Sequence, residues 1–492
     1  MCRLPSMPTR LSLLVSAWVL AGGGLGGAAL AQALPPVKPG QIASNFEQLR
    51  VTALADQLIA YLAKASAWVD DPQSRMPPQA ISTLVREAVL AHPEVRFSKE
   101  HRETASQSTR EAFAGFLPQV SGGVESGYRS NDKVSTPWTY SPAYQDKSHA
   151  VSLSARQLVY DFGAVGSLVD ARTALELAAA ARAEVKTSEL TLRALTGWME
   201  LFRAREAFAL TQMNVASRRQ ILEFIDEREQ LGGSSKSDVL RVRARLADAL
   251  AAQVAAKNRL AAAEAAYREV FDAAAPDQVR LPMAAAVSLD NYANLADWVA
   301  RNPYLTEARA QTEAARHEAK SAAAALLPSI QFEVTARRRD IDGAGVPGLD
   351  WGAGFSVKQS LYSGGADVAR KNQASQRAIE TQLAEDKLRR QVERAFAQAL
   401  SDVGNSAATL AARKEAAQVA AVALEAVREQ FIFRRGSLLD LLRSQEELYA
   451  AGRDLIDGIV EDSLVRYRLL DLAMELPPLF EIPVATAAKR DK

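Results

Sequence analysis

Residues 157–164 read QLVYDFGA, and a similar motif returns as QSLYSGGA at residues 359–366. Gln, Tyr, Gly and Ala recur at a shift of 359 − 157 = 202 residues. In both copies a segment of alternating apolar and polar residues ends in the motif, and an alanine-rich segment with helical spacing follows it. We therefore predict that each motif joins a strand directly to a helix. The residues at these joints are Tyr160, Gly163, Tyr362 and Gly365.

Upstream of the motif, further landmarks repeat. FLPQV at residues 116–120 corresponds to LLPSI at residues 326–330, a shift of 326 − 116 = 210 residues. The same shift relates His92-Pro93 to Asn302-Pro303, where proline interrupts a helical pattern. Because the shift changes between the two strands, the first hairpin loop is 210 − 202 = 8 residues longer than the second. The chain is therefore predicted to contain two copies of one structural unit.

Each unit is predicted to hold a helix, a pair of strands and a long helical hairpin. The bounds are 81–280 for the first unit, with strands in 118–160 and hairpin 164–271, and 291–476 for the second, with strands in 328–362 and hairpin 365–476. Neither hairpin contains proline, and both are rich in good helix formers. The first helix would be on the order of 100 Å long. The spacing of apolar residues in the return helices fits either a coiled coil within one chain or the wall of a helical tube.

The two ends of the chain have other patterns. Residues 1–31 carry arginines, an apolar run and small residues before Gln32, which is typical of a secretory signal. The only cysteine, Cys2, lies in this signal, so the mature chain is predicted to have no disulfide. Lys+Arg 59 and Asp+Glu 58 nearly balance, which argues against a nucleic-acid partner. Residues 32–80 are predicted to form an N-terminal extension lying on the main body, and residues 477–492 a C-terminal tail.

The predicted strands alternate along their length. Leu153 in the apolar set of the first unit corresponds to Phe355 in the second. Alternation fits a soluble antiparallel sheet with one wet face, and it also fits a membrane barrel whose strands face lipid and lumen in turn. Aromatic residues favour the membrane alternative, since they lie where a membrane interface would be: Trp138, Tyr140, Tyr144 and Trp351. Because the smallest bacterial barrels need about eight strands, several chains would share one barrel.

The turns of the two helical hairpins also correspond. Ser235 precedes Asp238 by three residues, and Ser437 precedes Asp440 by the same spacing. Serine followed three residues later by an acid is a capping-box pattern at the start of a helix. Capping alone explains these residues, and a further role is open.

No pattern for catalysis or cofactor binding is present. The four histidines, His92, His101, His149 and His317, are scattered without metal-ligand spacing. There is no P-loop or dinucleotide fingerprint. The sequence therefore predicts a protein that is not an enzyme and that needs neither a metal nor a cofactor.

Taken together, the signal, the two-fold repeat, the FLPQV and LLPSI motifs, the two joints and RRGSLLDLL at the second turn resemble the TolC family of outer-membrane channel proteins, especially its type I secretion members. The resemblance covers residues 81–476. It implies a mainly α fold with a β-barrel part: a trimer in which each chain gives four strands to one outer-membrane barrel, continued by a long α-helical barrel in the periplasm of a Gram-negative cell.

The resemblance also implies partners. These are two further copies of the chain, outer-membrane lipid, a periplasmic adaptor and an inner-membrane transporter of the ABC or RND type. The function implied is a passive conduit for type I protein secretion, with the outer-membrane component of a small-molecule efflux pump as the alternative. A periplasmic coiled-coil adaptor is a third possibility, but the doubled strand and helix unit argues against it.

The resemblance further implies that the second turn closes the periplasmic aperture. Asp440 matches the first acid of the family pattern, whereas Arg434 stands where Gly is usual and Arg443 where a second Asp is usual. In the family pattern, the two Asp of three copies would form two rings of carboxylates at the aperture. Because Arg443 stands at the position of the second Asp, this chain does not have the residues for the second ring. Asp440 and Arg443 lie three residues apart on one helical face, and in a trimer they would form ion pairs within or between chains. Asp238 is the corresponding residue of the first turn.

Overall fold

The computed structural model describes residues 57–70, 75–76, 78–131, 134–136, 138–141, 144–282, 285–292, 294–339, 348–433 and 435–483. The expected signal, Arg434 and residues 484–492 lie outside the described part. Described residues are mostly helical, and four strands form the main sheet. The prediction of a mainly α chain with four strands is confirmed.

Each half opens with a helix that is broken early. In the first half α2 (Pro78–Ala91) is followed by α3 (Pro93–Phe113) and a short 3-10 turn, Ala114–Phe116. In the second half a 3-10 turn, Leu289–Tyr292, precedes α6 (Leu295–Arg301) and α7 (Pro303–Ala324). The breaks fall before Pro93 and Pro303, because proline disfavours helical backbone in the residue before it.

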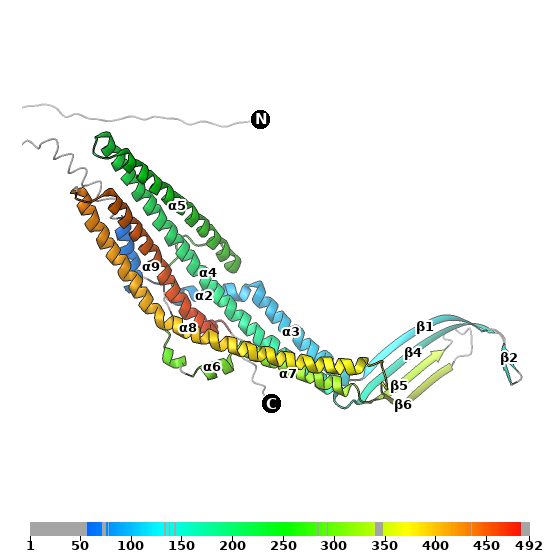
Figure 1. Cartoon of the computed structure of the whole chain (residues 1–492). Helices are drawn as coiled ribbons and strands as arrows, with labels where there is room; N and C mark the ends of the chain where they lie inside the picture. Colours follow the sequence, from blue (N-terminus) through cyan, green and yellow to red (C-terminus); the bar gives the residue numbers. More distant parts are fainter. Residues whose placement is uncertain are drawn as a thin grey trace, which may run out of the picture. The chain divides into compact units, whose positions relative to one another are not determined.

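The main sheet is antiparallel with the order β1-β4-β5-β6 (Figure 1). Its strands are β1 (Gln119–Asn131), β4 (Tyr144–Tyr160), β5 (Ser329–Arg339) and β6 (Gly348–Lys358). A small hairpin of β2 (Val134–Thr136) and β3 (Thr139–Ser141) lies in the longer first loop and has no counterpart in the sequence expectation. Each of the two halves therefore contributes one hairpin to the sheet, and β4 pairs with β5 where they meet.

The helical part consists mainly of two long hairpins. The first comprises α4 (Ala164–Gln230) and α5 (Lys236–Phe271), and the second α8 (Ala366–Ile432) and α9 (Leu438–Leu472), followed by the short α10 (Leu476–Leu479). The two helices of each hairpin lie side by side, and α7 packs between α4 and α8 (Figure 1). None of the described helices has the length and apolarity needed to cross a membrane.

The main core lies where α4 and α9 meet. Residues 57–70 of the extension are helical, and Leu58, Leu62 and Ala65 are buried in this core. A side chain at Gly452 of α9 would bring its Cβ to 2.8 Å from Leu62 Cδ2, so glycine permits the close approach. Tyr61 Oη donates to Glu206 Oε2 of α4 at 2.7 Å. The described part of the extension thus packs against the helical body.

The two strand-to-helix joints differ. β4 continues to Tyr160, whereas β6 ends at Lys358 and residues 359–362 are not in a strand, although the alternation was expected to reach Leu361. The reason is pairing: Tyr160 lies opposite Ile330 of β5, but β6 is at the edge of this single-chain sheet and has no further strand to extend its ladder.

Candidate functional site

Both joints turn through a glycine in the left-handed region. Gly163 has φ 86° and Gly365 has φ 85°, a conformation that costs other residues free energy. At the first joint the Asp161 carboxylate accepts hydrogen bonds from the backbone N–H of Gly163 at 3.0 Å and of Val165 at 2.7 Å. Tyr160 packs on Phe162, while Tyr362 at the second joint is exposed. The joints fix the direction in which each long helix leaves the sheet.

The two faces of the main sheet differ in chemistry. One face carries exposed apolar side chains, among them Val124 (77% exposed), Leu153 (55%), Phe355 (72%) and Val357 (66%). On the other face Arg337 pairs with Glu125 at 2.6 Å and Arg156 with Glu333 at 3.4 Å. An uncovered apolar sheet face of this kind needs a partner or an apolar solvent.

The turn between α4 and α5, in the first helical hairpin, has a complete capping box. Ser235 Oγ accepts from the backbone N–H of Asp238 at 3.2 Å, and Asp238 Oδ2 accepts from the backbone N–H of Ser235 at 3.2 Å. Arg241, one turn on, pairs with Asp238 at 3.7 Å. The acid of the first turn is thus satisfied within its own helix.

The second turn is capped in a similar way but is paired differently. Ser437 Oγ accepts from the backbone N–H of Asp440 at 3.1 Å and donates to Asp440 Oδ2 at 2.6 Å. Arg443 is exposed, and among the described residues it forms no ion pair with Asp440. The structure therefore places Asp440 in the helix cap without an ion pair to Arg443, and Arg434 lies outside the described residues.

The sequence analysis did not identify a buried arginine that lies near the second turn. Arg218 of α4 is 1% exposed, and its guanidinium pairs with Glu446 of α9 at 2.9 Å. Burial lowers the pKa of Arg218, and Glu446 opposes that shift. Beside it Gln445 donates to Ser217 Oγ at 3.2 Å. These contacts hold α4 against α9 close to the turn. In the sequence, the polar residue Gln445 at a position of the apolar seam was the feature that could have indicated this contact.

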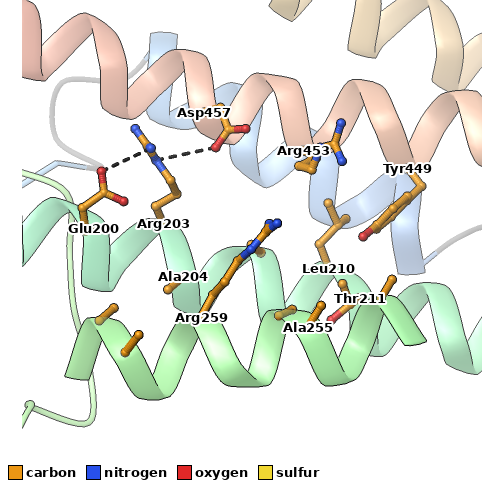
Figure 2. Close-up of a pocket in the computed structure, with 15 residues that line it drawn as sticks. Glu200, Arg203, Ala204, Leu210, Thr211, Ala255, Arg259, Tyr449, Arg453 and Asp457 are labelled. Carbon is orange, nitrogen blue, oxygen red and sulfur yellow. Dashed lines mark ion pairs between the residues drawn. The ribbon is translucent and has the colours of Figure 1, made fainter. Parts of the chain in front are cut away.

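A groove of about 500 Å³ lies between α4, α5 and α9 (Figure 2). Alanines of α5, such as Ala252 and Ala255, leave room on one wall. Arg203 of α4 pairs with Glu200 of its own helix at 3.2 Å and with Asp457 of α9 at 3.5 Å. Arg259 of α5 also lines the groove and forms no ion pair within the described residues. The groove therefore has one wall of small residues and charged side chains on its other walls.

Within the described residues no three His, Cys, Asp or Glu side chains gather as a metal site would require. The candidate sites are therefore the two turns, the groove and the apolar sheet face.

Comparisons with known proteins give a consistent result. The family model described as outer membrane efflux protein matches residues 84–270 and 295–458, more than half of the chain. BepC of Brucella suis, an outer membrane efflux protein, is 27% identical over 291 residues, covering 57% of this chain and 62% of the relative, so less than two thirds of BepC is matched. Outer membrane protein TolC of Escherichia coli is 22% identical over 406 residues, covering 76% of this chain and 78% of TolC.

Two further similarities bear on function and fold. The proteases secretion protein PrtF of Dickeya chrysanthemi is 23% identical over 398 residues, covering 78% of this chain and 84% of PrtF. Among solved structures, the CmeC outer membrane channel of Campylobacter jejuni matches with a TM-score of 0.72 and 14% identity, covering 80% of this chain and 85% of CmeC. At this identity the structural match concerns the fold alone.

Proposed function

The chain belongs to the outer membrane efflux protein family, and from this premise we propose that it forms the outer-membrane duct of a tripartite export machine. The protein is located in the outer membrane, and it is not an enzyme, because the family consists of outer-membrane channels. Three copies each contribute four strands to one barrel, and the long helices continue the duct into the periplasm.

The observation that carries this proposal is the sheet. It has one exposed apolar face, one charged face and an edge strand on either side, β1 and β6. A closed ring of such sheets places the apolar face in lipid and the charged face in a water-filled lumen, and closure removes the open edges.

The cargo proposed is a protein that leaves the cell by type I secretion. This is supported by the similarity to PrtF, a proteases secretion protein, over most of its length. The similarity to BepC, an outer membrane efflux protein, favours small-molecule efflux as the second candidate. In both cases the proposed partners are a periplasmic adaptor and an inner-membrane transporter of the ABC or RND type.

Two surfaces serve this function in the proposal. The groove between α4, α5 and α9 receives a helix of the periplasmic adaptor, with Arg259 available to an acidic residue on that helix. The second turn, with Asp440 and Arg443, closes the periplasmic end when no adaptor is bound.

Envelope fractionation followed by light scattering of the detergent-solubilised protein tests the proposal. We expect an outer-membrane protein with the mass of a trimer. A soluble periplasmic monomer would exclude the duct. Deleting the gene and comparing secreted proteins with drug sensitivity then separates the two cargo classes: loss of exported protein supports secretion, and increased drug sensitivity alone supports efflux.

A further inference from the structure

Three consecutive arginines end β5, and they are divided between the two faces of the sheet. On the charged face Arg337 pairs with Glu125 at 2.6 Å and Arg339 pairs with Asp350 at 2.9 Å. Because side chains alternate between the faces along a strand, Arg338 lies on the opposite, apolar face. It is exposed and forms no ion pair within the described residues. The apolar face therefore carries a cation whose charge no described carboxylate balances.

The strand register agrees with this position of Arg338. Residues directly opposite each other in an antiparallel sheet share one face. Arg338 lies opposite Val151 of β4 on one side and Leu349 of β6 on the other, and Val151 lies opposite Val124 of β1. These three neighbours are exposed apolar residues. Arg338 thus interrupts a row of apolar side chains that crosses all four strands.

Among the described residues, Arg338 is the only charged one on this face between its own row and the joints. The rows on that side are, from the joints outward, Tyr160, Ile330 and Val357; Gln157, Phe332 and Phe355; Val120, Ala155, Val334 and Ala353; and Gly122, Leu153, Ala336 and Trp351. The row beyond Arg338 is polar, with Ser126 opposite His149. Arg338 therefore lies at the height where the apolar face ends.

This height can be compared with the thickness of a membrane. Ile330, in the row nearest the joints, is 338 − 330 = 8 residues from Arg338. At about 3.4 Å per residue the separation along the strand is roughly 27 Å, and a strand tilt of about 35–45° reduces it to roughly 20 Å of height. The apolar band of a membrane barrel is about 25 Å tall, with aromatic residues at both edges. Tyr160 is in the first row and Trp351 in the row next to Arg338, so Arg338 lies at the outer boundary of the band.

The chemistry of arginine indicates what it binds at this boundary. Arginine costs far less free energy near a membrane interface than at the midplane, and its apolar stem can lie along Val151 and Leu349 while the guanidinium reaches the headgroups. The guanidinium is planar and always charged, and its paired N–H donors match the oxygens of a phosphate. Headgroup phosphates are the anions available at this height.

We propose that Arg338 binds a phosphate group of a phosphorylated glycolipid in the outer leaflet, on the outside of the sheet. The inference rests on the proposed function, which places the long helices in the periplasm. Because α4 and α8 follow the ends of β4 and β6 that lie opposite the start of β5, Arg338 is at the end of the sheet away from the helices. That end reaches the outer leaflet, whose glycolipid in Gram-negative cells carries phosphates on its sugars. A trimer has three such sites around its barrel.

Binding of lipid A, the phosphorylated anchor of that glycolipid, to the detergent-solubilised mature trimer tests the proposal. Native mass spectrometry measures the bound lipid as its concentration is raised. We expect the native protein to bind diphosphoryl lipid A about tenfold more tightly than dephosphorylated lipid A, and we expect Arg338→Gln to lose this preference, because the hydrogen bonds to a charged group are lost. Arg338→Lys keeps the charge and should retain part of the preference.

The neighbouring arginine provides the matched control. Arg339→Gln removes the same charge one residue away, on the charged face where Arg339 pairs with Asp350, and should bind lipid A as the native protein does. Equal losses in Arg338→Gln and Arg339→Gln would overturn the site, and so would an unchanged preference in Arg338→Gln. If Arg338→Gln does not assemble, the native protein alone decides, since equal binding of the two forms of lipid A overturns the proposal.

Two further probes identify the source of the phosphate. Phosphatidylglycerol has a phosphate but no phosphorylated sugar, and tighter binding of it than of lipid A would overturn the glycolipid. Displacement of lipid A by millimolar inorganic phosphate would show a site for a free anion and overturn the lipid. Each of these results leaves the duct intact. A soluble periplasmic monomer, in contrast, would remove the proposed function and the lipid site with it.

Discussion

At the scale of single residues, the second turn offers a test of gating. Because Asp440 is held by Ser437 and not by Arg443 of its own chain, a closing ion pair would have to form between copies. Asp440→Arg would then place like charges together and raise conductance in planar bilayers, and adding Arg443→Asp should restore the closed channel. If Asp440 only caps its helix, Asp440→Asn costs about 1 kcal/mol of stability and leaves conductance unchanged.

The first turn provides the matched control. Asp238 pairs with Arg241 inside one helix. Asp238→Arg should therefore break an intrachain pair and lower stability slightly without raising conductance. An equal rise in conductance from both variants would contradict a specific role for the second turn.

The ionisation of Asp471 should make the stability of the folded protein depend on pH. It is 8% exposed on α9 and accepts a hydrogen bond from Ser188 Oγ of α4 at 2.5 Å. Burial raises the pKa of Asp471 to about 6, with the Ser188 hydrogen bond acting in the opposite direction. The folded state therefore binds this proton more tightly than the unfolded state, so stability falls as pH rises from about 4 to about 6 and is level above that.

Asp471→Asn should remove this dependence. The variant should gain stability relative to the native protein at pH 8, by at most on the order of 3 kcal/mol, and little at pH 4. Thermal melting across this range measures the difference, with Ser188→Ala as a variant that should steepen it. A constant difference at all pH values would show that Asp471 does not titrate in this window.

Residue-level sequence reasoning worked where the chemistry is local. Gly163 and Gly365 could be placed at the joints, and Ser235 with Asp238 at a cap, because the partners are a few residues apart. Arg218 was missed because its partner Glu446 lies on another helix far along the chain, and Arg259 was missed because the groove it lines is formed by three helices; no local spacing indicates either.

At the scale of elements, the sheet faces can be tested by charge. Phe355 is on the exposed apolar face and packs on Phe332, with ring centroids 5.2 Å apart. Ser356 points to the charged face. Phe355→Arg should strongly reduce the amount of protein in the outer membrane, because Arg at mid-bilayer costs about 2–4 kcal/mol. Ser356→Arg should have a mild effect. Immunoblots of outer-membrane fractions measure both, and equal losses would reverse or abolish the face assignment.

Element boundaries were predictable to different degrees. The long helices follow from proline-free, alanine-rich sequence, and α4 begins at Ala164 as the QLVYDFGA motif indicates. The end of β6 at Lys358 could not be predicted, because it depends on which strand lies alongside and not on the alternation within the strand. The short pair β2 and β3 likewise lies in a loop without an alternating pattern.

At the scale of the whole molecule, most of the predicted architecture followed from the internal repeat. Two landmarks separated by 210 and 202 residues were enough to expect two equivalent halves, and the family model matches both halves. The sequence did not indicate the groove between α4, α5 and α9, since its shape depends on how three helices pack. It also gave no function for residues 57–70, whose burial against α4 and α9 shows a structural role.

The unequal hairpins have a consequence for the cell surface. β4 begins at Tyr144, but its pairing with β5 begins only at Ala150, so six residues, 144–149, rise above the second hairpin with β1 alone beside them. At about 3.4 Å per residue this is a step of roughly 20 Å. In the proposed trimer three tall β1–β4 hairpins, or tall ribbons, would alternate with three shorter β5–β6 hairpins, so the outer rim of the barrel would have three peaks. Trp138, between β2 and β3 in the loop that joins the two strands of the tall ribbon, is 93% exposed, so in this trimer it would lie at the peaks and not at the membrane interface.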